Sequence, residues 1–154
     1  MDDIKGTATF ISKPSPIFPS YRPMLRIGQN ILVLKLNSHA NKASLLKLHL
    51  FSWGFKELIN LDAIQSFVLS NSQERIRFFG IEPTLNRALS LAVYDGLMDF
   101  KSGMYVLTKR GQILAERILN DNDLFTAEKP VLKRIGKNPT EGSLTQLQKF
   151  WKNA

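Results

Sequence analysis

The sequence predicts a mainly α-helical domain with a small β-hairpin, and three observations support this fold class. Several stretches repeat apolar residues at the three-and-four spacing of an amphipathic helix. Between two of these stretches, the turn-forming residues 100–103 (FKSG) separate two short runs, LMDF and MYVL, that are typical of paired strands. With 154 residues and 44% hydrophobic content, the chain is long enough to bury one core of its own.

The chain is expected to form an extended N-terminal arm, residues 1–22, and a single domain, residues 23–154. The stretch SKPSPIFPSYRP holds four prolines, which lack a backbone donor and keep the preceding residue extended. Pro23 suits the first turn of a helix, which we expect over residues 23–37. Apolar residues cover more than one face of this helix, which normally means that protein encloses it on several sides. A domain of this size barely provides such an enclosure.

A second helix is expected over residues 43–55, ASLLKLHLFSWGF, after the polar break NSHANK. Leucines alternate there with Lys47 and His49, which also fits a strand, but the apolar pattern continues past the usual length of a strand and favours a helix. A third helix is expected at about residues 61–70, where apolar residues recur at three-and-four spacing and the turn formers Ser-Asn-Ser follow.

Residues 75–81, RIRFFGI, are expected to form a short strand or an extended lead-in to the next helix. That helix begins at Glu82-Pro83 and runs to about residue 96, where Gly96 ends it. Its two faces differ in polarity: Leu85, Ala88, Leu89, Ala92 and Val93 form an inward stripe, and Asn86, Arg87, Ser90 and Tyr94 face outward.

After the hairpin, Thr108 is a natural N-cap for a helix over residues 109–119, and Gly111 allows that helix to lie close to the hairpin. A helix, a two-stranded hairpin and a capped helix in this order make the second half of a winged-helix domain. We therefore expect a winged-helix (α+β) domain with extra N- and C-terminal helices and a winged-helix core at about residues 61–120.

The expected C-terminal extension, residues 121–154, contains a loop, a basic turn or short helix (VLKRIGK) and a last helix in NPTEGSLTQLQKFW. That last helix carries Leu144, Leu147 and Trp151 on one face.

The net charge of +8 predicts attraction to polyanions or to an acidic partner surface, without distinguishing the two. The basic excess lies in residues 1–60 and 129–154, and the middle of the chain is nearly balanced. The absence of cysteine excludes a disulfide framework and any thiolate zinc site. No signal pattern and no apolar run of bilayer length is present, so we expect a soluble, cytoplasmic protein without a membrane segment.

Nothing in the sequence indicates catalysis or a bound cofactor. His39 and His49 are ten residues apart with no carboxylate at metal-ligand spacing, so we interpret them as a loop residue and a helix-surface residue. Gly103 and Gly111 lack the spacing of a phosphate-binding loop. No serine lies in a nucleophile-elbow pattern. The expected protein is therefore not an enzyme.

The candidate DNA contacts are Asn86, Arg87, Ser90 and Tyr94 on the helix before the hairpin, Lys101 at the hairpin tip, and Lys109 and Arg110 at the start of the following helix. The helix before the hairpin offers only one cation, however, so an ordinary solvated face explains it equally well. Lys109 and Arg110 also stand at a helix N-terminus, where positive charge opposes the helix dipole.

A candidate partner interface comprises Lys133 and Arg134 in the basic tail and Phe150 and Trp151 in the last helix. The basic residues would meet a phosphate backbone or an acidic protein. For the two aromatic residues, and for the apolar excess of the first two helices, an ordinary core is the alternative to a partner surface.

Two long runs resemble one protein family. They are RIRFFGIEPTLNRALSLAVYDGLMDFKSGMYVLTKRGQILAERIL and LFTAEKPVLKRIGKNPTEGSLTQL. The matching features are the helix start PTLNRAL from Pro83, an aliphatic residue and Gly before the hairpin, Leu107-Thr108-x-x-Gly111, and Glu128-Lys129-x-x-Leu132 before a threonine-led last helix. In these features the chain resembles the middle component of bacterial ABC-three-component systems, the small third subunit of Lamassu-type defence complexes.

The resemblance implies a non-enzymatic winged-helix adaptor that bridges an SMC-like ABC ATPase and an effector, often a nuclease, in anti-phage or anti-plasmid defence. The partners it implies are the ATPase and the effector, with DNA contacted weakly and non-specifically at most. A stand-alone winged-helix transcription regulator is the alternative, with the first two helices serving for dimerisation.

Overall fold

The structure, a computed structural model, describes residues 23–71, 76 and 82–153, the last three without their side chains. The expected N-terminal arm and most of the expected extended segment at 75–81 therefore lie outside the described residues. The elements are α1 (Pro23–Leu36), the 3₁₀ helix η2 (His39–Asn41), β1 (Lys42–Ser44), α2 (Leu45–Gly54), α3 (Leu58–Leu69), α4 (Pro83–Tyr94), β2 (Met98–Lys101), β3 (Met104–Leu107), α5 (Lys109–Asn120), α6 (Glu128–Ile135) and α7 (Glu141–Asn153).

The described part of the chain is mostly helical with one small antiparallel sheet, as the sequence predicts. The strand alternative for residues 43–55 is wrong, because residues 45–54 form α2. The basic segment after residue 127 is a helix, α6, and not a turn. Two elements were not anticipated, η2 and β1, which occupy the polar break and the start of the segment expected to be the second helix.

The sheet has the strand order β1-β3-β2, and both pairings are antiparallel. The predicted hairpin joins β2 and β3, with Met98 opposite Leu107 and Lys101 opposite Met104. Ser102 and Gly103 both have positive φ, which is the conformation that a tight two-residue turn between twisted strands requires. β1 pairs with β3 from the other side, with Ala43 opposite Tyr105, so the sheet links residues 42–44 to the hairpin.

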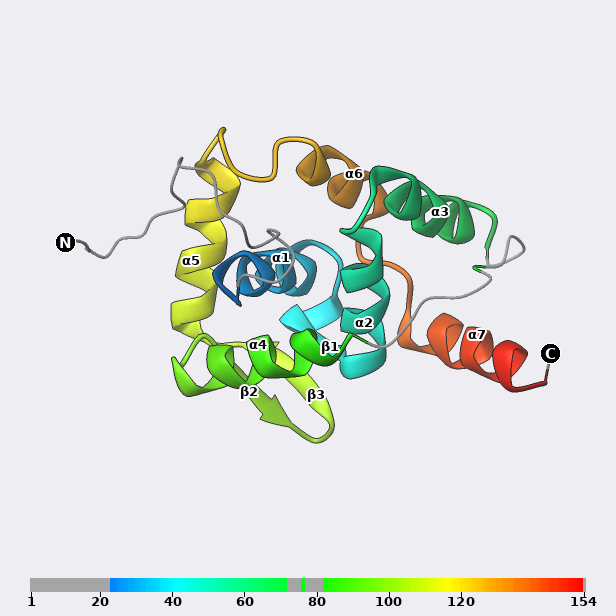
Figure 1. Cartoon of the computed structure of the whole chain (residues 1–154), viewed down its shortest axis with the longest axis horizontal. Helices are drawn as coiled ribbons and strands as arrows, with labels where there is room; N and C mark the ends of the chain where they lie inside the picture. The colour runs from blue at the N-terminus through cyan, green and yellow to red at the C-terminus, as the bar shows by residue number, and fades with distance from the viewer. Residues whose placement is uncertain (1–22, 72–75, 77–81, 154) are drawn as a thin grey trace.

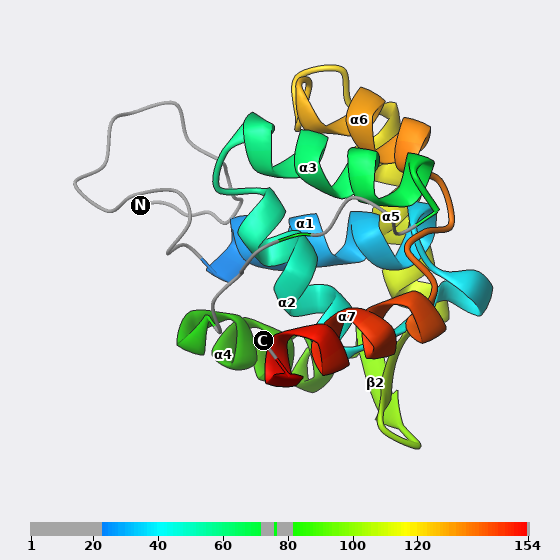
Figure 2. The same cartoon turned by 90° about the vertical axis from the view of Figure 1, so that its right-hand side faces the viewer.

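α1 lies at the centre of the molecule, with α5, α2, α4 and α6 around it (Figures 1 and 2). All nine residues from Arg26 to Leu34 are buried, including three polar ones. The expectation that a chain of this size barely encloses such a helix is wrong, because the described elements surround it on all these sides. The apolar excess of the first helix therefore serves the core, as part of one cluster that includes Ile31, Leu48, Phe51, Phe67, Leu89 and Leu132.

Thr108 and Gly111 position α5 against the end of α4, as the sequence predicts. The Thr108 hydroxyl accepts a hydrogen bond from the Gly111 N–H at 3.0 Å and donates one to the Gly96 carbonyl oxygen at 2.6 Å. A Cβ atom on Gly111 would lie 2.0 Å from the Leu97 carbonyl oxygen, so any larger residue would force α5 away from the chain that leads into β2. The absence of a side chain at residue 111 is what permits this close packing.

None of the helices in the described part of the chain has both the length and the apolar character needed to cross a membrane.

Candidate functional site

The outer face of α4 and the hairpin beside it form the surface on which most of the predicted contact residues lie. α4 and the hairpin occupy the same edge of the molecule in both views, and α4 packs against β2 (Figures 1 and 2). Leu85, Ala88, Leu89 and Ala92 are buried, which confirms the predicted inward stripe. The residues predicted to face outward, Asn86, Arg87, Ser90 and Tyr94, are all exposed.

Two apolar residues of this surface were missing from the sequence prediction. Leu91 is 38% exposed on α4 and Phe100 is 54% exposed on β2, where its ring lies 4.7 Å from that of Tyr105. Leu91 follows Arg87 by four residues and precedes Tyr94 by three, so the helical spacing was sufficient to place it on the outer face. Tyr94, at 88% exposure, is the most exposed large apolar side chain on α4.

The four cations predicted to contact DNA are exposed, but they differ in their surroundings. The Lys101 ammonium lies 3.7 Å from the Asp99 carboxylate on the same strand. Within the described chain, Arg87, Lys109 and Arg110 form no ion pair. Arg110 Nη1 lies 4.0 Å from the position of a Cβ on Gly96, just beyond the C-terminus of α4. At this position the positive charge of Arg110 interacts favourably with the negative end of the α4 dipole. This interaction offsets the unfavourable position of the same charge at the N-terminus of α5.

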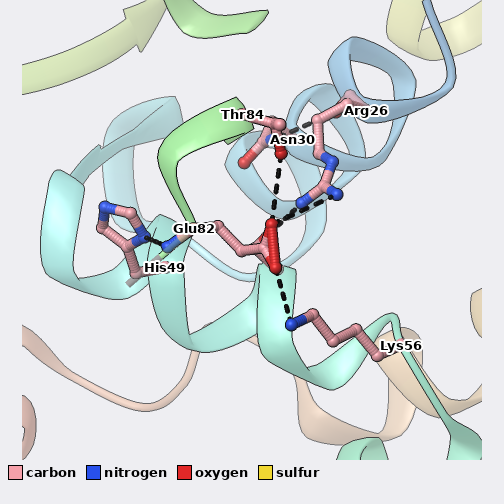
Figure 3. Close-up of polar contacts among 7 residues, drawn as sticks. Arg26, Asn30, His49, Lys56, Glu82 and Thr84 are labelled. Carbon is pink, nitrogen blue, oxygen red and sulfur yellow. Dashed lines mark hydrogen bonds and ion pairs between the residues drawn. The ribbon is translucent and has the colours of Figure 1, made fainter. Parts of the chain in front are cut away.

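A buried polar cluster fixes the start of α4, and we call it the Glu82 cluster. It consists of Arg26, Asn30, His49, Ser52, Lys56, Glu82 and Thr84 (Figure 3). Glu82 is the N-cap residue of α4, and its carboxylate points between two cations from the neighbouring helices. The Lys56 ammonium lies 2.6 Å from Oε2, and Arg26 Nη2 lies 3.6 Å from Oε1. The cluster therefore ties α1 and α2 to the first turn of α4.

The remaining contacts satisfy the other polar groups of the Glu82 cluster. The Thr84 hydroxyl donates to Glu82 Oε1 at 3.1 Å, and the Arg26 guanidinium donates to the Ser52 hydroxyl. Asn30 Nδ2 donates to the Arg26 carbonyl oxygen at 2.8 Å. Burial would raise the pKa of Glu82, but the hydrogen bond and charge of Lys56, helped by Thr84 and Arg26, bring this pKa below its usual value. The carboxylate is therefore held in its charged form.

His49 belongs to the Glu82 cluster, and its predicted position on a helix surface is wrong. Its side chain is only 4% exposed, because α2 is covered on most of its circumference. The Glu82 N–H donates to His49 Nδ1 at 3.3 Å, so the imidazole caps the start of α4 through the backbone. Burial lowers the pKa of His49; the Glu82 carboxylate opposes this shift and the Arg26 charge adds to it.

The candidate partner residues of the C-terminal extension do not lie together. Lys133 and Arg134 are exposed on α6, which packs against α3 at one edge of the molecule. Phe150 is 42% exposed on α7, which packs against α2 nearer the opposite edge (Figures 1 and 2). The side chain of Trp151 lies outside the described residues. Leu144 and Leu147 are buried, which confirms that one face of the last helix is docked on the core.

The described residues offer no cluster of metal ligands and one polar cavity. No three His, Asp or Glu side chains among them gather closely enough to hold a metal ion. A cavity of about 310 Å³ lies between the end of α3 and the start of α7, lined by amide and hydroxyl side chains together with Phe67, Val68 and Pro139. Because no titratable side chain lines it, this cavity supplies no general acid or base.

No protein-family model, no curated protein and no solved structure matches the chain.

Proposed function

We propose that this chain is a non-enzymatic winged-helix adaptor, the middle component of an ABC-three-component system of the Lamassu type. In this role it bridges an SMC-like ABC ATPase and an effector, such as a nuclease, in cytoplasmic defence against phages or plasmids. The proposal joins the family resemblance of residues 75–119 and 124–147 to the arrangement of the described elements.

The order of the elements supports the winged-helix assignment. α1, β1 and α2 come first, α4 precedes the β2–β3 hairpin, and β1 pairs with residues 104–106 of β3 to complete a three-stranded sheet. In this assignment α4 takes the place of the reading helix, the hairpin is the wing, and α3 is an insertion between the second and third helices of the domain.

The observation that carries the adaptor function is the chemistry of the outer face of α4. A helix that reads DNA bases presents several polar and basic side chains to the groove and its phosphates. α4 exposes Asn86 and Ser90 but only one cation, Arg87, and it adds the apolar Leu91 and the almost fully exposed Tyr94. Tyrosine and arginine are the residue types that concentrate binding energy at protein–protein interfaces.

The alternative, a stand-alone DNA-binding regulator, is favoured by the exposed Lys101, Lys109 and Arg110 around the hairpin. Cations at these positions would contact phosphates without reading bases. The adaptor proposal therefore expects weak, sequence-tolerant and strongly salt-dependent DNA binding by the isolated chain. Nanomolar binding to one palindromic sequence at physiological salt would favour the regulator.

The decisive experiment is co-expression of the full chain with the products of the neighbouring genes, followed by affinity and size-exclusion chromatography. The adaptor proposal expects one complex that contains the chain, an SMC-like ATPase and an effector. The chain purified alone serves as the control and should neither hydrolyse ATP nor cleave DNA. Failure to assemble with either neighbour, or turnover by the isolated chain that depends on one of its side chains, would overturn the proposal.

A further inference from the structure

We infer that the outer face of α4 and the hairpin form a docking surface for an acidic, apolar-rich segment of a partner protein. This inference rests on the proposed function and specifies which surface of the adaptor is used. We call it the α4–hairpin surface and define it by Arg87, Leu91, Tyr94, Phe100, Lys109 and Arg110.

The apolar part of the α4–hairpin surface is exposed in the chain alone. Tyr94 is 88% exposed and Phe100 is 54% exposed, so both rings contact water in the isolated chain. A partner that covered them would remove this contact. Phe100 lies two residues after the fully buried Met98 on the same strand, so it belongs to the sheet face that turns toward the helices. Large aromatic side chains presented in this way typically mark an interaction surface and contribute much of its binding energy.

The charged part of this surface selects an acidic partner. Within the described chain Arg87, Lys109 and Arg110 have no carboxylate partner, whereas Lys101, on the opposite face of the hairpin from Phe100, lies 3.7 Å from Asp99. An incoming carboxylate would therefore meet three guanidinium or ammonium groups that need not give up an existing ion pair. Opposite charges around an apolar centre speed association and exclude partners of the wrong sign.

The same features favour a polypeptide over a nucleic acid as the occupant. The exposed Leu91 and Tyr94 occupy helix positions where a base reader needs hydrogen-bonding groups. A protein segment with both carboxylates and apolar side chains complements the whole surface.

α4 is also held in place before any partner arrives. The Glu82 cluster fixes its N-terminus to α1 and α2, and the Thr108 hydroxyl bonds to the Gly96 carbonyl oxygen just beyond its C-terminus. A helix fixed at both ends loses little further freedom when it binds, so more of the contact energy appears as affinity.

A set of four double variants of the full chain tests this inference in the co-expressed complex. Leu91→Ser with Tyr94→Ser removes the apolar part, and Arg87→Glu with Arg110→Glu reverses the charged part. The matched controls are Ile59→Ser with Leu69→Ser, which are exposed on α3, and Lys42→Glu with Arg117→Glu, which are exposed on β1 and α5. All four pairs change exposed side chains, and a melting curve for each verifies that it is folded.

The inference expects each α4–hairpin pair to weaken binding to the partner complex by about tenfold or more, while both controls bind like the wild type. The loss caused by charge reversal should shrink at high salt, whereas the loss caused by the apolar pair should persist.

If the wild type binds and all four pairs bind equally well, the docking surface lies elsewhere and the adaptor function stands. If the wild type binds neither neighbour, the proposed function fails first. If random-sequence duplex DNA displaces the partner from the wild type, and the α4–hairpin pairs abolish only DNA binding, the occupant is DNA and the inference is overturned.

Discussion

α4 and α7 each begin beside a glutamate that faces a buried cation, but only one of the two arrangements is complete. Glu82 at the start of α4 accepts from Lys56 and Thr84 and lies 3.6 Å from the Arg26 guanidinium. Glu141, the first residue of α7, accepts a hydrogen bond from the Ser44 N–H at 3.1 Å. Its charge raises the pKa of Lys47, but this effect is smaller than the opposing effect of burial. Burial dominates at Lys47 and, with a smaller contribution from Lys137, lowers its pKa to about 8.

The polar groups around the start of α7 are correspondingly less well satisfied. Asn37 Nδ2 donates to the carbonyl oxygens of Leu132 and Gly136, but its buried Oδ1 has no hydrogen-bond partner. The Lys137 ammonium donates to the carbonyl oxygens of Lys35 and Ser38, at 3.2 Å each. The comparison teaches that buried charge stabilises the fold at α4, where it is paired, and costs free energy at Lys47, where it is not.

The largest expected effect is that of Glu82→Gln, which removes the carboxylate that faces Lys56 and the buried Arg26. We expect the free energy of unfolding at pH 7 to fall by about 3 kcal/mol, measured by urea denaturation. Because the folded-state pKa of Glu82 is lowered, the wild-type advantage is complete above pH 4.5 and is lost as the pH falls through the folded-state value. Equal stability of the two proteins at pH 7 would contradict the paired role of this glutamate.

Lys47→Met should act in the opposite direction, because it keeps the aliphatic stem and removes the buried ammonium. We expect a gain of about 2 kcal/mol in the free energy of unfolding at pH 7. Since the Lys47 pKa is lowered from 10.5 to about 8, the cost of its charge is fully present below pH 8 and disappears as the pH rises toward 10.5. Denaturation at both ends of this range checks the sign, and a loss of stability at pH 7 would show that the ammonium is paired after all.

His49→Leu should have a smaller effect, since it removes the acceptor of the Glu82 N–H and keeps an apolar group in the core. We expect a loss of about 1 kcal/mol at pH 7.5. The folded-state pKa of His49 lies below 6.5, so the wild type itself loses stability as the pH falls below that value. The difference between the two proteins should therefore narrow in mild acid, and a constant difference would speak against a neutral imidazole.

Glu141→Gln gives the smallest expected effect and the most direct control for Glu82→Gln. The amide oxygen of glutamine accepts from the Ser44 N–H as the carboxylate does, and no ion pair is broken. We expect a change below about 0.5 kcal/mol in the free energy of unfolding. A loss as large as that of Glu82→Gln would erase the difference between the two helix starts.

The elements that could be predicted from the sequence are those whose signal is local. α4 and α5 have one repeating apolar face, a proline or threonine at the start and, for α4, a glycine at the end, and each was placed within two residues. β1 was missed because a three-residue strand is too short to show alternation, and its partner β3 lies sixty residues further along the chain. His49 was misplaced because a helix buried on most sides gives no outward face to which a polar residue can be assigned.

The candidate site divides in the same way. Asn86, Arg87, Ser90 and Tyr94 on α4 follow from helical spacing alone and are exposed as predicted, whereas Leu91 was overlooked although the same spacing applies to it. The Glu82 cluster depends on Arg26 and Glu82 meeting across 56 positions of sequence, for which no spacing rule exists. The position of Arg110 near the C-terminus of α4 likewise depends on the close packing that Gly111 permits between α5 and Leu97.

β2 is one of the two edge strands of the sheet, so the side of β2 that does not face β3 offers backbone donors and acceptors to which a second chain could add. The strand has only four residues, and Asp99 and Lys101 alternate along it. Short length and charge are two of the means by which natural sheets discourage such growth. The Asp99–Lys101 pair, which weakens the hairpin as a phosphate contact, would thus also discourage edge-to-edge aggregation of the protein.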